Sequence, residues 1–312
     1  MTLAAALLLG AGLAGWLAPR RLRGLTAAGA HPRVVLVAWL SSVVSVVVTV
    51  ALAVAALLLP DHGFGTFGVF HHCLSALLHG SSPRVEAISG AVGSLLLSGL
   101  VVRLGVVSVR GARRRAGTRR DHLAVLRIAG RHEPGPPSTL WLEHDEPLAF
   151  SLAGRPGVVV ATDGLAERLT SAQLDAVLTH ERAHLAGRHH LVVAAGDAVA
   201  TVLPFLPLFR STPAVVRELV ELAADASAVR TCGVDAVRGA LLAVTGFGAP
   251  GSALAMSRDA VEARLANLPR VDQPTRPART VLSCGLAGVT AMVLPPLLAL
   301  SGLLFVAVFA CS

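Results

Sequence analysis

Long apolar runs alternate with short arginine-rich segments along this 312-residue chain. A helix needs roughly 20 apolar residues to cross about 30 Å of hydrocarbon, and a strand of that length buried on both faces is improbable. Runs that satisfy this requirement cover residues 1–18, 34–59, 86–109 and 281–310. The pattern therefore predicts four membrane-spanning helices.

The arginines indicate how these helices are oriented. Arg20, Arg21 and Arg23 follow the first run, a dense block from Arg110 to Arg120 follows the third, and Arg279 precedes the fourth. Arginine-rich flanks favour the cytoplasmic side. We therefore expect a multi-pass protein of the cell membrane, with an outer loop over residues 60–83 and a cytoplasmic segment after residue 110. The block at residues 110–120 is also expected to contact anionic lipid.

Composition supports a membrane protein. Hydrophobic residues make up 54% of the chain and charged residues only 15%, whereas soluble domains carry about 25% charge. These values exclude an ordinary soluble globular protein and a disordered one. The net charge is +8, but the arginines lie beside apolar runs and aromatic residues make up only 4%. Direct binding of nucleic acid is therefore not expected.

The segment between the third and fourth runs has a mixed pattern. Short apolar stretches at residues 140–142, 148–152 and 158–161 predict strands, and residues 154–157 predict a hairpin turn. We predict an α+β class: a multi-pass α-helical membrane protein with a small cytoplasmic domain. The expected division is 1–110 for three membrane helices, 111–279 for the cytoplasmic domain and 280–312 for the last helix.

A helix capped by Thr170 or Ser171 is predicted to continue to Leu185, and it carries the first chemical motif. In His180-Glu181-Arg182-Ala183-His184, the two histidines lie one turn apart on the same face. Two such imidazoles can bind one zinc ion at about 2.0–2.1 Å. Glu181 lies beside them, where it can take a proton from a zinc-bound water.

A second helical stretch, residues 218–225, places carboxylates in apolar surroundings, where a carboxylate needs a partner. Glu221 is expected to bind the zinc, with Glu218 as the alternative third ligand. Asp225 is expected to accept a hydrogen bond from a ligand imidazole. All ligands must meet on one side of the membrane, so the apolar segment at residues 191–209 cannot cross it once. We expect a buried or interfacial helix there.

These motifs resemble the BlaR/MecR-type integral-membrane zinc metallopeptidases, which are gluzincins that combine HExxH with ExxxD. The resemblance covers about a third of the chain. HtpX-like and CAAX-prenyl-type membrane proteases share the same motif logic. The resemblance implies a zincin-like domain that binds Zn²⁺. It also implies one carboxylate that acts as general base and another that hydrogen-bonds a zinc ligand. The matching residues are His180, His184, His190, Glu181, Glu221 and Asp225, together with residues 149–150, 157–160, 164–165 and 174–178.

The resemblance implies an endopeptidase in signal transduction that cleaves a protein: a cytoplasmic repressor of the BlaI/MecI type, or itself. The alternatives are an HtpX-like quality-control protease, a non-catalytic signal transducer, and a transporter that uses these side chains as ion ligands. A pure transducer has no need of Glu181, and a transporter would place the motif within a span. The sequence stops at Ser312 without a penicillin-binding domain, so direct β-lactam sensing is not expected.

Two features of substrate handling are also predicted. During hydrolysis, the carbonyl oxygen of the cleaved bond becomes negatively charged and needs a hydrogen-bond donor. The chain has no tyrosine to supply one. His189, His190 and Arg230 are the candidates. The strand at residues 158–161 is a candidate for pairing with an extended substrate, although an ordinary strand within the sheet fits the same pattern.

Overall fold

The computed structural model of the chain describes residues 2–58, 83–245, 261–268 and 277–310. These residues are mostly helical, with one small sheet. The outer loop predicted over residues 60–83 lies outside the described residues, apart from its last residue. The α+β class is therefore consistent with the structure.

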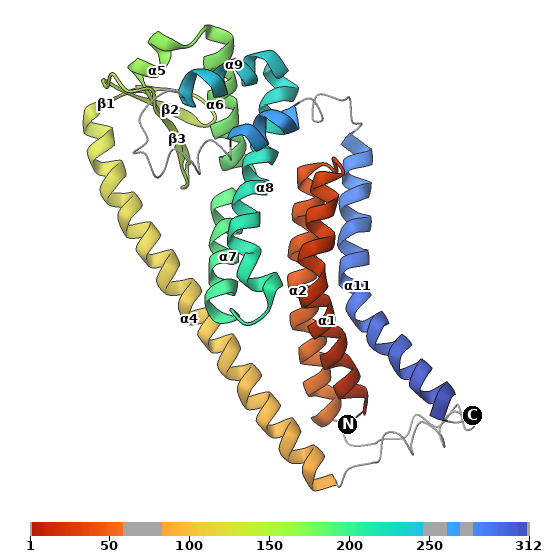
Figure 1. Cartoon of the computed structure of the whole chain (residues 1–312). Helices are drawn as coiled ribbons and strands as arrows, with labels where there is room; N and C mark the ends of the chain where they lie inside the picture. Colours follow the sequence, from red (N-terminus) through yellow and green to blue (C-terminus); the bar gives the residue numbers. More distant parts are fainter. Residues whose placement is uncertain (1, 59–82, 246–260, 269–276, 311–312) are drawn as a thin grey trace.

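Four long helices form a bundle: α1 (Thr2–Ala27), α2 (Pro32–Leu58), α4 (Pro83–Ala129) and α11 (Pro277–Ala310). Figure 1 shows the sheet and the shorter helices at one end of this bundle. The connection from α1 to α2 and the arginine-rich end of α4 lie at that same end, so the basic segments gather beside the sheet.

By length and composition, three helices among the described residues could cross a membrane: Pro32–Leu58, Ile88–Leu126 and Arg279–Leu297. The first predicted span forms the helix α1, which packs against α2 and α11 but is not one of the three. Apolar side chains such as Leu95, Leu96 and Leu282 are exposed on the outside of the bundle. Such a surface suits contact with lipid.

Inside the bundle, a few polar contacts hold the helices in register. Trp39 of α2 is fully buried, and its indole Nε1 donates a hydrogen bond to Thr212 Oγ1 at 2.9 Å. The Ser45 hydroxyl donates to the Met292 carbonyl oxygen of α11 at 2.6 Å. These bonds satisfy polar groups that would otherwise be buried without partners.

The sheet contains β1 (Gly130–Glu133), β2 (Ser138–Leu142), β3 (Ala149–Leu152) and β4 (Val158–Thr162). Its order is β1-β2-β4-β3; β2 and β4 are parallel, and the other pairs are antiparallel. The three predicted strands are confirmed, and residues 154–157 join β3 to β4 as expected. Arg119 Nη1 of α4 donates to the Ala153 carbonyl oxygen at 2.7 Å, which ties the long helix to this turn.

Two expectations about the sheet need correction. The additional strand β1 was not predicted, because its sequence Gly-Arg-His-Glu is polar and largely exposed. The stretch proposed for substrate pairing belongs to β4, which is buried along its whole length and bonded to β2 on one side and β3 on the other. It has no free edge to offer a peptide. The free edge on this side of the sheet belongs to β3.

The motif helix begins as the sequence predicts. Helix α6 (Ser171–Ala186) follows Thr170, whose side chain accepts from the Gln173 backbone N–H, while the Gln173 side chain accepts from the Thr170 backbone N–H. This reciprocal cap satisfies two N–H groups that the first helical turn leaves free. Helix α5 (Asp163–Arg168) precedes it, and α9 (Val234–Thr245) packs against it.

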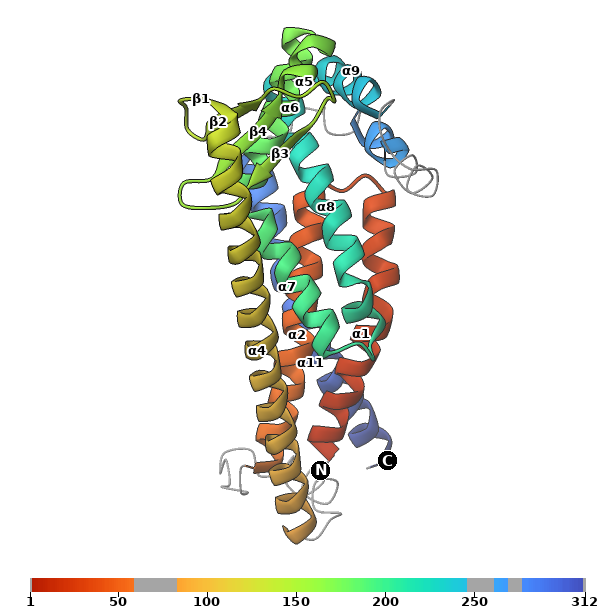
Figure 2. The same ribbon diagram turned by 90° about the vertical axis from the view of Figure 1, so that its left-hand side faces the viewer.

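The ambiguous apolar segment forms a helical hairpin. Helix α7 (His189–Val202) runs away from the sheet beside the bundle, and α8 (Pro207–Cys232) returns alongside it (Figure 2). Leu203 to Leu206 make the turn, and a proline begins α8, where its missing N–H costs nothing. Helix α7 thus runs along only part of the bundle before α8 brings the chain back, so α6 and the later part of α8 meet at the same end (Figure 1).

Candidate functional site

Helix α6 aims two imidazoles at the same point. His180 Nε2 and His184 Nε2 lie 3.0 Å apart, and only 12% and 15% of the two side chains are exposed. The four-residue spacing brings both rings to the face of α6 that packs against α8. The two ring nitrogens therefore converge at a point where both imidazoles are largely buried.

Helix α8 supplies a carboxylate to the same point. Glu221 Oε2 lies 3.4 Å from His180 Nε2, and Glu221 Oε1 lies 3.4 Å from His184 Nε2. Glu218, the alternative third ligand, is exposed and is not among the residues grouped here. The structure thus brings together His180, His184 and Glu221.

The spacing of these atoms fits a zinc ion. A tetrahedral site with ligands about 2.0–2.1 Å from the metal sets neighbouring ligand atoms about 3.3–3.4 Å apart. Taking one ligand atom from each residue, the three atoms lie within 4.8 Å of one another. The two imidazole Nε2 atoms are 3.0 Å apart, and each lies 3.4 Å from a different oxygen of Glu221. Two imidazoles and one carboxylate form a set that zinc accepts while keeping one position open.

Asp225 fixes the orientation of the first imidazole. Its Oδ1 lies 2.9 Å from His180 Nδ1, and only 2% of the aspartate side chain is exposed. The Nδ1–H of His180 donates to this carboxylate, which leaves the lone pair on Nε2 pointing at the other two groups. The predicted outer partner of the ligands therefore lies in contact with one of them.

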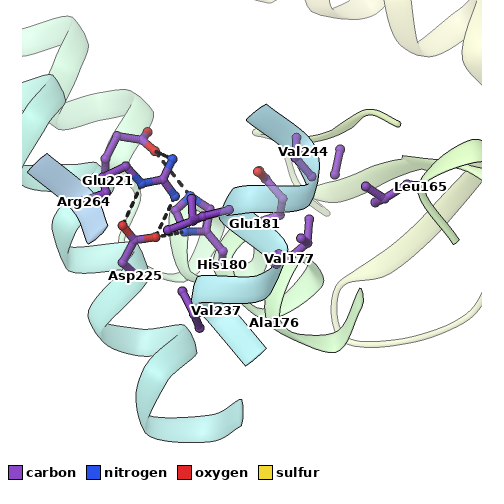
Figure 3. Close-up of a pocket in the computed structure, with 13 residues that line it drawn as sticks. Leu165, Ala176, Val177, His180, Glu181, Glu221, Asp225, Val237, Val244 and Arg264 are labelled. Carbon is purple, nitrogen blue, oxygen red and sulfur yellow. Dashed lines mark hydrogen bonds and ion pairs between the residues drawn. The ribbon is translucent and has the colours of Figure 1, made fainter. Parts of the chain in front are cut away.

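Arg264 was not foreseen from the sequence and completes this cluster. Its Nε and Nη2 donate to the two oxygens of Asp225 at 2.7 Å each, and its Nη1 lies 3.6 Å from Glu221 Oε2 (Figure 3). This two-pronged contact neutralises a buried carboxylate. Although burial favours the neutral acid, hydrogen bonds from Arg264 and His180 lower the pKa of Asp225 to about 2.

The surroundings shift the pKa values of the two histidines in opposite directions. Burial alone lowers the pKa of His180, but hydrogen bonds with Asp225 and Glu221 outweigh it and raise this pKa to about 9. At His184, burial and the neighbouring charge of His180 lower the pKa to about 4. Because an imidazole binds metal only when deprotonated, the pair would release the His180 proton on metal binding.

Glu181 faces a cavity beside the three converging groups. Burial raises the pKa of Glu181, while the charge of His180 and a hydrogen bond with Ser151 act in the opposite direction. The cavity has a volume of about 230 Å³, and its walls are mostly apolar. Figure 3 shows His180, Glu221, Asp225 and Arg264 gathered on one side of this cavity. The other walls include Leu165, Val177, Val237 and Val244.

A second cavity, of about 350 Å³, lies on the other side of the cluster and is lined by His184, His189 and Arg217 among others. Glu221 borders both cavities. Strand β3 also passes both, since Ala149 lines the first and Ser151 the second. The free edge of the sheet therefore runs past the converging imidazoles.

The candidate oxyanion donors lie in different places. His189 and His190 line the second cavity, His190 with an exposed side chain. Arg230 lies near the end of α8, its Nη2 donates to Ser227 Oγ at 3.2 Å, and it lines neither of the two cavities. The structure thus brings His189 and His190 toward the site and leaves Arg230 aside.

Comparison with known proteins gives two matches. Residues 113–258 match Peptidase family M48. Over 87 residues, the chain is 36% identical to a protein named Protease HtpX homolog from Moorella thermoacetica. This match covers 27% of the chain and 29% of that relative, so the aligned part spans less than a third of the relative's length. No solved structure matches the chain significantly. The matches support a membrane protease and do not single out the BlaR/MecR type.

Proposed function

We propose that the chain is a membrane-bound zinc endopeptidase of the M48 type, with its active site on the cytoplasmic side. The match of residues 113–258 to Peptidase family M48 is the starting point. The observation that carries the proposal is the convergence of His180, His184 and Glu221 next to Glu181 and a cavity. An ion-binding site without chemistry would not need a half-buried carboxylate base beside its ligands at the edge of a cleft.

In the proposed reaction, His180, His184 and Glu221 hold the zinc. A bound zinc would polarise the scissile carbonyl and lower the pKa of a bound water. Glu181 accepts a proton from the attacking water and passes it to the leaving amine as the carbon–nitrogen bond breaks. The raised pKa of Glu181 suits a carboxylate that must both take up and release a proton. Asp225 and Arg264 keep His180 in the required orientation.

The edge of β3 is the proposed binding strand for the substrate. An extended peptide can add to a free strand edge through backbone hydrogen bonds, and its side chains then alternate between faces. Along β3, the peptide would pass the 230 Å³ cavity, whose apolar walls suit an aliphatic or aromatic side chain next to the cleaved bond. This interpretation replaces β4, whose two edges are already paired.

The basic segments support the cytoplasmic placement. The arginine block at residues 110–120 belongs to α4, which continues from an apolar stretch directly into the sheet. Since arginine-rich flanks favour the cytoplasm, the sheet and the site would lie just under the membrane. Helix α1 would add a fourth membrane helix to the three apolar ones.

The substrate is proposed to be a protein close to that surface. A repressor of the BlaI/MecI type or the chain itself would make the enzyme part of a signalling pathway. The similarity to a protein named Protease HtpX homolog favours the alternative role in membrane quality control. Cleavage of a co-expressed repressor at one defined bond would support signalling, whereas cleavage of several unfolded membrane proteins would support quality control.

Metal removal tests the proposed chemistry. Treating the purified full-length protein in detergent with a zinc chelator should abolish hydrolysis of an unfolded protein such as casein, because the attacking water would depend on the bound metal for its lowered pKa. Adding back one equivalent of zinc after the chelator is removed should restore it. Hydrolysis that continues after complete removal of metal would contradict the proposal.

A further inference from the structure

The second imidazole of the metal cluster has a partner that the chemistry above does not use. His184 Nδ1 lies 2.9 Å from His189 Nδ1, and the two rings are nearly perpendicular, at 88°, with centroids 4.9 Å apart. On the other imidazole, His180 Nδ1 contacts the Asp225 carboxylate. In each ring, Nδ1 therefore has a partner on the side away from the metal position. The partner is the Asp225 carboxylate for His180 and the His189 imidazole for His184.

The chain between α6 and α7 is shaped to produce this contact. Arg188 adopts a left-handed conformation with φ of 49°, which is rare for a residue with a side chain. This turn brings His189 back over the end of α6, where only 8% of it is exposed. A Cβ atom at Gly187 would collide with His189 Nε2, so glycine leaves room for the ring.

The positions of the ring protons determine which histidine donates the hydrogen bond between His184 and His189. If His184 Nε2 offers its lone pair to the metal, the ring proton of neutral His184 must reside on Nδ1. Its partner at 2.9 Å, His189 Nδ1, must then be the acceptor, and His189 carries its own proton on Nε2. A reversed bond would place the proton of His184 on Nε2, where it would block the metal.

We propose that His189 is a positioning residue for the metal centre: its Nδ1 accepts the Nδ1–H of His184 and so fixes the ring that binds zinc. The inference rests on the proposed zinc site. It also gives His189 a different role from oxyanion donor, because the nitrogen facing the cluster is an acceptor. Outer partners of this kind typically change metal affinity by about 10–100-fold.

Two amide substitutions test this role in the full-length protein. The side-chain amide of His189→Asn can place its oxygen where Nδ1 lies, whereas that of His189→Gln reaches the position of Nε2. Zinc affinity, measured by competition with a chelator, should fall about 10–100-fold for His189→Gln and His189→Ala. His189→Asn should stay within a few-fold of the unmodified protein. His132→Ala, at an exposed histidine of β1 that lines neither cavity, should leave zinc affinity unchanged.

The outcomes separate this inference from the proposed function. Equal zinc affinity in the Asn and Gln variants, or undiminished affinity in His189→Ala, would overturn the positioning role while the zinc site stands. Absence of zinc binding by the unmodified protein would overturn the zinc site itself. The melting temperature of the metal-free variants provides the control for folding, and the Asn and Gln variants are compared only with each other if the Ala variant is unstable.

Discussion

Replacing Glu181 with glutamine should abolish most peptide hydrolysis while leaving the metal centre intact. The amide is nearly isosteric with the carboxylate but cannot accept the proton of the attacking water. A general base typically contributes on the order of 10² to 10⁴-fold to the rate, and kcat should fall by that factor. Zinc content should remain near that of the unmodified protein, because Glu181 is not one of the three residues that converge on the metal position.

A matched control lies on the same helix. Asp175→Asn also neutralises a carboxylate of α6, but Asp175 is exposed and lines neither of the two described cavities. Its activity should match that of the unmodified protein. If Glu181→Gln keeps both its zinc and its full rate, Glu181 is not the base. If the two variants lose activity equally, the effect comes from charge on α6 and not from proton transfer.

Replacing Glu221 with alanine should remove the metal. This change removes the one anionic ligand, leaves two imidazoles, and takes from the Arg264 guanidinium the carboxylate that lies 3.6 Å from its Nη1. We expect zinc affinity to fall by more than the roughly 10–100-fold that loss of an outer partner costs, and activity to be lost with it. Equilibrium binding of zinc to the full-length protein measures the effect.

Glu218→Ala provides the comparison for this second prediction. Glu218 lies one turn earlier on α8 and was the alternative ligand from sequence, but its side chain is exposed. Zinc affinity should be unchanged in this variant. A larger loss of zinc affinity from Glu218→Ala than from Glu221→Ala would reverse the choice of third ligand.

The parts of the site that depend on local spacing were predictable. His180 and His184 must share a face of any helix, and Thr170 marks where that helix starts. The apolar surroundings of Asp225 predicted that it would hydrogen-bond a ligand imidazole, and the structure shows that this imidazole is His180. Strands with continuous apolar stretches, such as β4, were also found, because a buried strand leaves that pattern in the sequence.

Contacts between distant segments were not predictable. Arg264 follows Asp225 by 39 residues and lies in a short helical segment, residues 261–268, with no motif to mark it. Strand order is likewise a tertiary property, so nothing in Val158 to Thr162 indicated that both of its edges are paired. Hydropathy alone also cannot separate a single span from a hairpin, and Leu203 to Leu206 turn the chain back.

The central claim concerns the atoms around one metal ion, and X-ray absorption at the zinc edge examines them directly. The full-length protein, loaded with one equivalent of zinc, should show nitrogen and oxygen neighbours at about 2.0–2.1 Å, with the outer-shell signature of two imidazoles. The signature should drop to one imidazole in His184→Ala. A spectrum with sulfur neighbours at about 2.3 Å, or one without any imidazole signature, would contradict the account.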